Sequence, residues 1–509
     1  MLPLLLSILL ISVTSIWLWK KLVAKPDKFP PGPPRLPLIG SLPFFPAQVK
    51  NGKQKMSTWM QETFGPISGL YLGKRPMVIL SDFDLIKDLY KKHEASGRPK
   101  NKPFHENRFG SPDGSQRGLL QSSGQEWQEQ RRFTMKQLKD LGFGKSSMED
   151  MINEEVAKLA QLLEKDVGKE MSMNLKLNLS IVNALWYLLT GEHFALEDPE
   201  LQAIVAKFDS LLRLEIKNTP FSILMEGWMP KLAKFTSPGF KHMKDLFTDI
   251  KDLVGKALVD HKKTYDPDHP RDFMDMYLAE IDKSSNAPDS SFHGTRGEES
   301  LVSTMLDLFL AGTETTSSSL LWSILFLLHH PEVQARVQRE IDEVVGVGNQ
   351  VSLEDRALLP YTNAVLMESM RMATIVPSAL PHAATEDIQL NGYVIPKDSV
   401  ILANLLHVHY DPTYWPNPDE FNPNRFYDEA TRTFKQNERL IPFSIGKRYC
   451  LGQSLAEKEY FLFFTGLLQR FTFEPAPGSP LPKIGRDSGV VVGILRNAPL
   501  YKTILKVRQ

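Results

Sequence analysis

The sequence predicts a mainly α-helical fold with small β-sheets and an N-terminal membrane anchor helix. Apolar residues recur at helical spacing along most of the 509-residue chain, whereas strand-like runs are few and short. The first nineteen residues carry no charge and are about long enough to cross a bilayer as a helix. No Gly/Ser-rich linker, charge block or internal repeat interrupts the interior, so one large domain should follow the anchor.

The anchor and the segment after it set the predicted domain boundaries. Residues 1–20 form a transmembrane signal anchor that ends in tryptophans suited to the membrane interface and is followed by lysines. The positive-inside rule therefore places the rest of the chain in the cytosol. Residues 21–40 form a basic, proline-rich hinge, because the prolines of FPPGPPRLPLIG exclude helix and stiffen the backbone. Residues 41–509 form the main domain.

Short strands and many helices are expected in this domain. Helical patterns occur at residues 53–64, 82–92, 124–140, 150–166, 173–191, 198–214, 238–264, 299–329, 331–345 and 360–372. Two strand pairs are predicted, Ile67–Leu72 with Pro76–Leu80 and Gln389–Ile395 with Val400–Asn404, and short strands recur near 490–506. Residues 410–450 have no periodicity, and a long irregular stretch in a compact domain usually serves a function.

Composition excludes several classes of protein. Lys+Arg and Asp+Glu both number 60, so the chain lacks the basic excess of polyanion binders, and we expect no nucleic-acid partner. A single cysteine, Cys450, rules out a disulfide within the chain and a zinc site built from several thiolates. No nucleotide-binding or flavin-binding motif is visible, so reducing equivalents for any redox chemistry must come from another protein.

The strongest chemical signal surrounds the cysteine. The run Phe443-Ser-Ile-Gly446-Lys-Arg448-Tyr-Cys450-Leu-Gly452 precedes an apparent helix, GQSLAEKEYFLFFTGLL. A thiol at a helix N-terminus feels the positive end of the dipole, and Arg448 adds positive charge, so both favour the thiolate. The two glycines allow tight turns and close approach of the backbone to a flat ligand. A lone cysteine without such neighbours is more often an inert, buried apolar residue.

This run resembles the haem-binding signature of the cytochrome P450 family, Phe-x-x-Gly-x-Arg-x-Cys-x-Gly, at every fixed position. The resemblance implies a cytochrome P450 fold and a haem b cofactor bound by residues 41–509, with Phe443 in the cofactor site. It also implies that Arg448 bonds a haem propionate and that the Cys450 thiolate is the iron ligand, which favours O–O cleavage. It extends from about Pro30 to the C-terminus and is strongest to the microsomal drug- and steroid-metabolising branch.

A second signal interrupts the longest apolar run with the sequence AGTETT. Leu308, Ala311 and Thr315 share one helical face, where small residues would let a planar cofactor lie close. One alternative is a buried helix whose Ser and Thr hydroxyls donate to backbone carbonyls one turn earlier in the same helix. The motif resembles the distal helix of the family, which implies that Glu314 and Thr315 deliver protons during catalysis.

Further candidates lie on other helices. Trp127 and Arg131 align at i, i+4 spacing, and the resemblance implies that both contact a haem propionate, as does His382. Glu368-x-x-Arg371 puts a carboxylate and a guanidinium on one face. The resemblance adds Arg425 to this pair in a core network that fixes the loop under the haem. Two pairs with the same spacing, Glu129/Arg132 and Glu429/Arg432, are expected on the surface. A basic stripe is either a solvated face or a docking surface for the electron donor: Arg132, Lys136 and Lys139.

Together the motifs predict a haem-thiolate monooxygenase that inserts one atom of O2 into a lipophilic small molecule, such as a steroid, terpenoid, fatty acid or xenobiotic. The resemblance implies electrons from NADPH through NADPH–cytochrome P450 reductase, with cytochrome b5 as a second donor, and a single-pass anchor in the endoplasmic reticulum membrane. Two alternatives are a thiolate haem protein that rearranges peroxides without a reductase, and a haem sensor or carrier. The Glu314–Thr315 pair argues against both, because neither needs proton delivery to oxygen.

The resemblance also assigns the substrate pocket. Its segments are Phe104–Leu120, Phe208–Leu214, Leu308–Thr315, Val376–Leu380 and Gly489–Gly493. A mainly apolar lining favours broad acceptance with modest selectivity, whereas Arg108 or Arg213 could anchor the carboxylate of an acidic lipid. One glycosylation sequon, Asn178-Leu-Ser180, should stay unmodified because the domain faces the cytosol.

Overall fold

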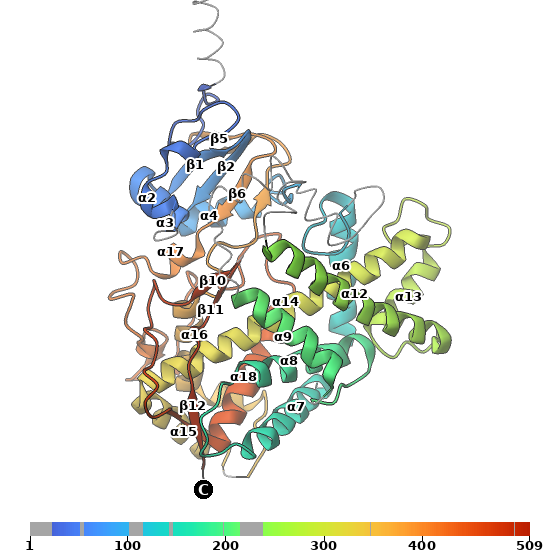
Figure 1. Ribbon diagram of the computed structural model, residues 1–509, viewed down its shortest axis with the longest axis vertical. Helices are drawn as coiled ribbons and strands as arrows, with labels where there is room; N and C mark the ends of the chain where they lie inside the picture. Colours follow the sequence, from blue (N-terminus) through green and yellow to red (C-terminus); the bar gives the residue numbers. More distant parts are fainter. Residues whose placement is uncertain are drawn as a thin grey trace, which may run out of the picture.

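Helices dominate the computed structural model, which describes residues 23–50, 55–100, 116–141, 146–196, 198–213, 238–346, 348–492 and 494–508. Figure 1 places a small β-containing lobe beside the N-terminal end of the chain and a larger helical part below it. The predicted mainly α fold with small sheets is confirmed. Within the described residues, no helix is long and apolar enough to cross a membrane, and the predicted anchor at residues 1–20 lies outside them.

The helices follow the predicted periodicity closely. They are α2 (Ala47–Lys50), α3 (Met56–Phe64), α4 (Phe83–Lys91), α6 (Gly124–Asp140), α7 (Ser146–Glu164), α8 (Asn174–Thr190), α9 (Pro199–Arg213), α12 (Pro238–Thr264), α13 (Phe273–Lys283), α14 (Gly294–His329), α15 (Pro331–Val344), α16 (Pro360–Ala373), α17 (Leu405–His409) and α18 (Gln453–Arg470), with short 3-10 turns η1 (Leu42–Phe44), η2 (Asp355–Leu358) and η3 (Pro423–Arg425). The sequence prediction omitted α13, although the Asp272 carboxylate caps its N-terminus by accepting from the Asp275 N–H.

The sheets differ from the prediction in one pairing. Strands β1 (Ile67–Leu72) and β2 (Arg75–Leu80) form the expected hairpin, and β6 (Val400–Ala403) pairs in parallel with β2 and antiparallel with β3 (His382–Ala383). The predicted pairing of residues 389–395 with 400–404 is wrong. Strands β4 (Ile388–Leu390) and β5 (Tyr393–Ile395) instead form their own hairpin. Its turn residues Asn391 and Gly392 both have positive φ, as a tight two-residue hairpin turn requires.

The remaining strands form small two-stranded sheets. They are β7 (Tyr427–Asp428) with β8 (Thr433–Phe434), β9 (Phe471–Pro475) with β12 (Thr503–Val507), and β10 (Val490–Val492) with β11 (Leu495–Asn497). Most of residues 410–450 has no regular structure, as predicted, and the hairpin β7–β8 lies beside α16.

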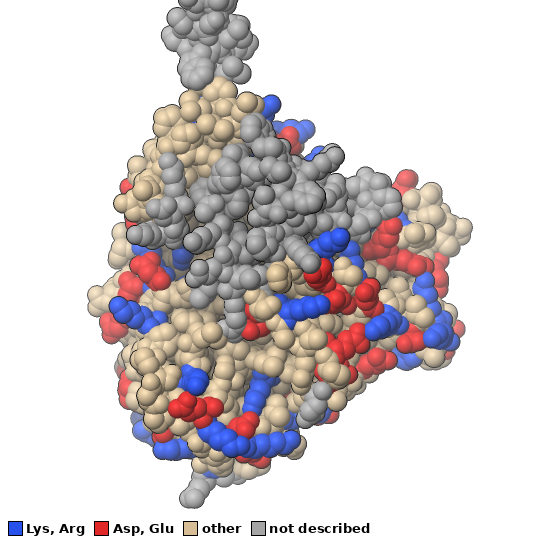
Figure 2. All heavy atoms as spheres, viewed as in Figure 1, with Lys and Arg blue, Asp and Glu red and all other residues tan. Residues whose placement is uncertain are grey.

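The core is built around α14, which runs unbroken for 36 residues and buries most of its length. Helix α8 packs tightly against it, because Gly312 leaves room: a Cβ at Gly312 would lie 2.6 Å from Cδ2 of Leu185. Charges of both signs are interspersed over the face shown in Figure 2, which agrees with their equal numbers in the sequence.

Candidate functional site

Cys450 lies in the loop that leads into α18. Its backbone N–H donates to the Phe443 carbonyl over 2.9 Å, which closes the loop, and the Lys447 N–H donates to the Tyr90 carbonyl at the end of α4 over 3.1 Å. Gly446 has a φ of +80°, and a Cβ there would lie 2.1 Å from the Tyr90 carbonyl oxygen. Gly446 therefore permits a close approach of the cysteine loop to the end of α4.

The electrostatics of the thiol also differ from the prediction. Burial raises the pKa of Cys450, and only in part do the Gly452 and Gln453 N–H groups and the charge of Arg131 oppose this rise. The helix N-terminus therefore acts in the expected direction but does not prevail over desolvation. A metal cation on the sulfur would reverse the balance, because a coordinating thiol loses its proton outright.

Two buried guanidinium groups lie above this loop and donate to backbone carbonyls. Arg448 donates to the carbonyls of Ser96 (2.9 Å), Leu119 (3.2 Å) and Ser122 (2.6 Å). Arg98 donates to those of Leu120 (2.8 Å), Leu380 (3.1 Å) and Pro381 (2.7 Å). The two arginines thus hold together three stretches that are far apart in the sequence. The sequence interpretation missed Arg98, because a lone arginine before a proline has no distinguishing pattern.

Helix α6 adds a third cation to this group. Trp127 is buried, and the Arg448 guanidinium carbon lies 3.8 Å from its ring centroid. Arg131, one turn along α6, lies over the Tyr449 ring at 4.8 Å and donates to the Tyr449 carbonyl over 2.8 Å. Trp127 and Arg131 therefore both contact the cysteine loop, from the side of the helix that the i, i+4 spacing predicted.

His382 completes the group from β3. Its ring stacks on Tyr90 with centroids 4.0 Å apart, and Nδ1 lies 2.8 Å from the Ala95 carbonyl. Burial and the charges of Arg98 and Arg448 hold the pKa of His382 well below its usual value, so the imidazole is neutral and donates from Nδ1. The Tyr90 hydroxyl beside it is buried with no hydrogen-bond partner among the described residues.

The charges of this group are all of one sign. Within the described part of the chain, no carboxylate pairs with Arg98, Arg131 or Arg448. Burial and mutual repulsion lower the pKa of Arg98 to about 10 and lower that of Arg448 further. Burying an uncompensated charge costs about several kcal/mol, so the group fits an anionic ligand that carries carboxylates. Haem b has two propionates and an iron that accepts a thiolate, and the residues present fit both features.

The distal face of α14 carries the predicted stripe. Leu308 and Thr315 are half-buried and Ala311 is exposed, although most of the helix is buried. The Thr315 hydroxyl donates to the Ala311 carbonyl over 2.7 Å, and Thr313 and Ser317 bond back in the same way. These hydroxyls thus bond to carbonyls of their own helix, as the alternative interpretation of the sequence expected. Helix α14 continues through the AGTETT sequence without a break.

Glu314 lies on another side of α14. It is buried, and its Oε2 accepts from the Asn178 side-chain amide of α8 over 3.2 Å. Consecutive helical residues point about 100° apart, so the Glu314 and Thr315 side chains leave α14 in different directions. Asn178 itself is 1% exposed, and this burial would prevent glycosylation of the sequon on either side of a membrane.

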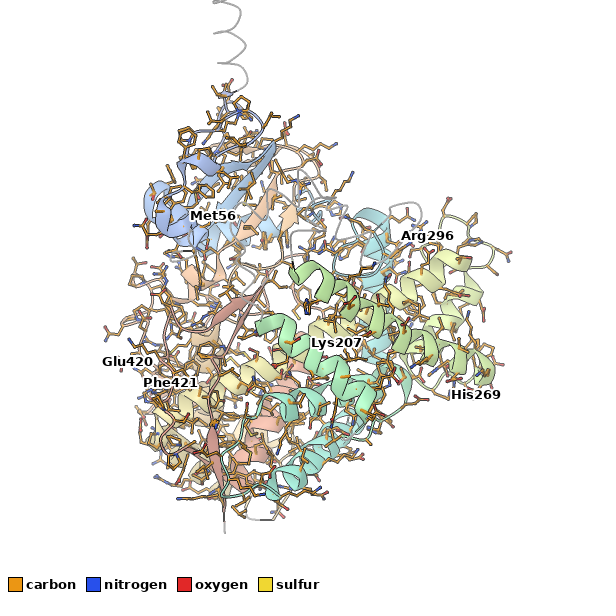
Figure 3. The ribbon with its side chains drawn as sticks, viewed as in Figure 1. Met56, Lys207, His269, Arg296, Glu420 and Phe421 are labelled. Carbon is orange, nitrogen blue, oxygen red and sulfur yellow. The ribbon has the colours of Figure 1, made fainter. Side chains whose placement is uncertain are left out.

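The predicted Glu368 network is confirmed. Arg371 forks onto Glu368 with Nε–Oε2 and Nη2–Oε1 distances of 2.7 and 2.8 Å, and Arg425 Nε lies 3.2 Å from Oε1. Arg371 also donates to the carbonyl of Glu420, which Figure 3 labels beside Phe421 in the irregular segment. The look-alike pairs do not form: Glu129 accepts from the Ser291 N–H, and Glu429 pairs with Arg336.

Two charged side chains in or next to the predicted pocket segments, Asp307 and Arg117, are used within the protein. Asp307 accepts the N–H groups of Leu119 and Leu120, and Arg117 pairs with Glu299 at 3.4 Å and with Glu126 at 3.6 Å. Residues 101–115, with Arg108, lie outside the described residues, as do residues 214 and 493.

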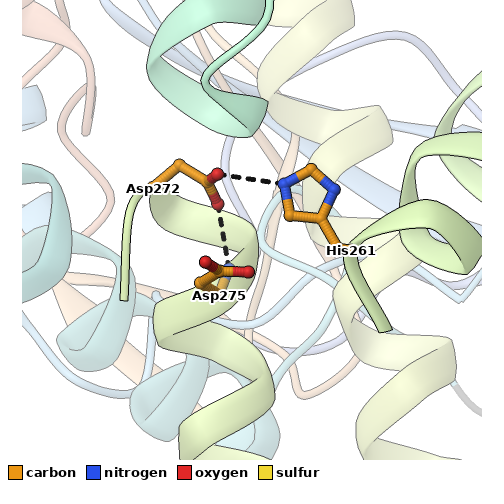
Figure 4. A group of neighbouring side chains, drawn as sticks. All are labelled: His261, Asp272 and Asp275. Atoms are coloured by element: carbon orange, nitrogen blue, oxygen red, sulfur yellow. Dashed lines mark hydrogen bonds and ion pairs between the residues drawn. The ribbon is translucent and has the colours of Figure 1, made fainter. Parts of the chain in front are cut away.

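A second buried cluster could in principle hold a metal. His261, Asp272 and Asp275 bring three ligand atoms within 4.8 Å of one another where α12 meets α13 (Figure 4). Its atoms are already engaged. His261 Nε2 lies 2.9 Å from Asp272 and Nδ1 lies 2.8 Å from the Ala257 carbonyl, while Arg271 donates to Asp275 over 2.6 Å. The charged groups of this cluster pair with one another, so we interpret the cluster as a structural contact between α12 and α13.

The only cysteine of this helical domain lies beside arginines that no described carboxylate neutralises, an arrangement that fits a haem-thiolate protein. Residues 30–504 match the model of the cytochrome P450 family. The chain is 38% identical over 453 residues to cytochrome P450 2J2 of Homo sapiens, covering 89% of this chain and 87% of that protein. It is 35% identical to cytochrome P450 2B4 of Oryctolagus cuniculus, covering 91% of each chain, and 35% identical to cytochrome P450 2D28 of Mesocricetus auratus, covering 94% and 92%.

The chain therefore belongs to the cytochrome P450 family, as the cysteine motif predicted. It is a haem b-dependent monooxygenase that uses O2 and acts on lipophilic small molecules. The similarity to 2J, 2B and 2D members agrees with the branch that the sequence indicated.

Proposed function

We propose that Cys450 ligates the haem iron and that Arg98, Arg448, Trp127, Arg131 and His382 surround the propionates. The observation that carries this proposal is the one-signed group of buried arginines beside the only cysteine of the chain. Bound haem supplies the redox-active iron at which O2 is activated. Phe443 shapes the loop, because its carbonyl accepts the Cys450 N–H and thereby fixes the direction of the sulfur.

Glu314 and Thr315 are proposed to manage protons on the distal side. The Thr315 hydroxyl lies on the partly exposed stripe of α14, where it would be available as a proton donor if it left the Ala311 carbonyl. Glu314 is the buried acid next in sequence, and its carboxyl is held on the α8 side. The described pocket segments leave few uncompensated charges, which supports a lipophilic substrate of steroid, terpenoid, fatty-acid or xenobiotic type.

We further propose that residues 1–20 anchor the enzyme in the endoplasmic reticulum membrane, with the catalytic domain in the cytosol. NADPH–cytochrome P450 reductase is the proposed electron donor and cytochrome b5 a second one. Arg132, Lys136 and Lys139 are all exposed on α6, and Tyr449, next to Cys450, is 38% exposed. An acidic donor surface would therefore meet a basic stripe close to the proposed iron ligand.

Replacement of the ligand tests the proposal. Cys450→Ser should either bind haem poorly or bind it without the reduced carbonyl spectrum of a thiolate haem, because the axial ligand sets the electronic properties of the iron. Tyr449→Phe keeps the ring beneath Arg131 and serves as the neighbouring control, which should retain that spectrum. An unchanged thiolate spectrum in Cys450→Ser would overturn the assignment. Turnover without any reductase would instead favour a peroxide-rearranging enzyme.

A further inference from the structure

Asn178 has a buried amide with one end bonded and the other end unpartnered. Its Nδ2 donates to Oε2 of Glu314 over 3.2 Å, between α8 and α14. Its Oδ1 is buried and has no hydrogen-bond partner among the described residues. An unsatisfied buried acceptor costs about 1–3 kcal/mol, so this end of the amide needs an explanation.

A carboxyl that carries protons needs a partner for both of its states. Ionised, it only accepts hydrogen bonds; protonated, it also donates one. A side-chain amide can serve both states, because its NH2 donates to the carboxylate and its carbonyl oxygen accepts from the carboxylic acid. Asn178 holds its Nδ2 3.2 Å from Oε2 of Glu314, and the unpartnered Oδ1 of the same amide offers an acceptor to a protonated Glu314.

Another asparagine of α8 provides a contrast. Asn183 also donates to a buried carboxylate, with Nδ2 3.1 Å from Oε2 of Glu155. Both ends of its amide are occupied, however, because its Oδ1 accepts the Phe194 N–H over 2.8 Å. Lys158 Nζ and His193 Nδ1 also lie 2.8 and 3.3 Å from Oε1 of Glu155. The hydrogen-bonding groups of Asn183 are thus all occupied, whereas Oδ1 of Asn178 has no partner among the described residues.

We propose that Asn178 is a positioning residue for Glu314, which its amide holds on α8 in both protonation states. This inference rests on the proposed role of Glu314 as a proton carrier. The Asn178 amide would fix the position of the Glu314 carboxyl both when it is protonated and when it is ionised. Replacement of Asn178 should therefore disturb proton delivery while the cysteine loop and the arginine group, which lie on elements other than α8, stay intact.

Coupling of NADPH use to product formation is the first measurement. In the haem-loaded enzyme with its reductase, Glu314→Gln is the reference for lost proton delivery. Asn178→Ala and the equally shaped Asn178→Asp should lower product per NADPH by about tenfold, as expected for a lost hydrogen bond to a charged group. They should also change the solvent deuterium isotope effect on kcat and keep haem content. Asn183→Ala, which removes the matched amide of the same helix, should leave coupling and isotope effect unchanged.

Infrared spectroscopy gives a second readout that does not depend on turnover. The difference between the parent protein and Glu314→Gln isolates the carboxyl bands of Glu314, and Asn178→Ala should shift them, whereas Asn183→Ala should not. If Glu314→Gln stays fully coupled, the proposed role of Glu314 itself fails. If Glu314→Gln uncouples the enzyme but neither Asn178 variant changes coupling or the Glu314 bands, Asn178 is only a packing residue and the inference is wrong.

Discussion

The protein contains two buried groups of charges that are built in opposite ways. Around His261, a carboxylate faces the imidazole and a guanidinium faces Asp275, so each charge has a partner within the protein. Around Arg448, three arginines meet only carbonyls and aromatic rings among the described residues. The first group is complete without a ligand, and the second is not. Sign imbalance, more than burial or the number of charged residues, distinguishes the proposed ligand site from the structural joint.

The Glu368 network lies between these extremes but behaves as a structural group. Arg371 and Arg425 share one carboxylate. Their remaining N–H groups donate to the carbonyls of His409, at the end of α17, and of Asn417 in the irregular segment. Its members bind α16 to the residues that precede the cysteine loop. Loss of a charge should therefore cost folding stability in this network and cofactor affinity in the Arg448 group.

The largest expected effect is on Glu368. Glu368→Gln removes the common partner of two arginines, and breaking a fully buried ion pair typically destabilises by about 3–5 kcal/mol. Urea unfolding of the purified enzyme measures this loss. Glu429→Gln is the exposed counterpart, because Glu429 pairs with Arg336 at 2.7 Å on the surface, and it should cost less than about 1 kcal/mol. Equal losses in the two variants would contradict the distinction between the two pairs.

The next effect concerns haem retention. Arg448→Met removes one cation from the uncompensated group, and we expect haem to dissociate at least about tenfold faster, because a hydrogen bond to a charged group is worth about 1.5–3 kcal/mol. Transfer of haem to an excess of a scavenger globin measures the rate. Arg271→Met, in the self-neutralised group, should leave that rate unchanged. A faster loss in Arg271→Met than in Arg448→Met would reverse the assignment of the two groups.

The smallest expected effect is a pH dependence of stability. Burial opposes a rise in the pKa of His261, but the hydrogen bond to Asp272 and its charge prevail, so the folded pKa lies above the usual 6.5. The resulting stabilisation is fully present below about pH 6.5 and is lost as the pH rises through the folded pKa. Unfolding free energies on either side of this window should fall with rising pH in the parent protein. His261→Gln should lack that component, and an identical slope would argue against the charged pair.

Sequence reasoning recovered what depends on local patterns. Helical periodicity gave the main helices, and the fixed spacing around Cys450 identified the family. What it missed depends on contacts between distant residues. The pairing of β6 with β2 is decided by the fold and not by the strands themselves. Arg98 becomes recognisable only beside Arg448, and the Asn178 sequon acquires its meaning only opposite Glu314.

The contacts of the two buried arginines determine when, during synthesis of the chain, the proposed site can form. Arg98 and Arg448 hold the same backbone stretch, through Leu120 and Leu119, yet 350 positions separate them in a chain of 509. The Cys450 loop is pinned on Tyr90 by the same long-range closure. The proposed haem pocket therefore cannot assemble until nearly nine-tenths of the polypeptide has been synthesised. Cofactor capture is thus a late event of biogenesis, and truncated chains that end before Arg448 have no means of retaining haem.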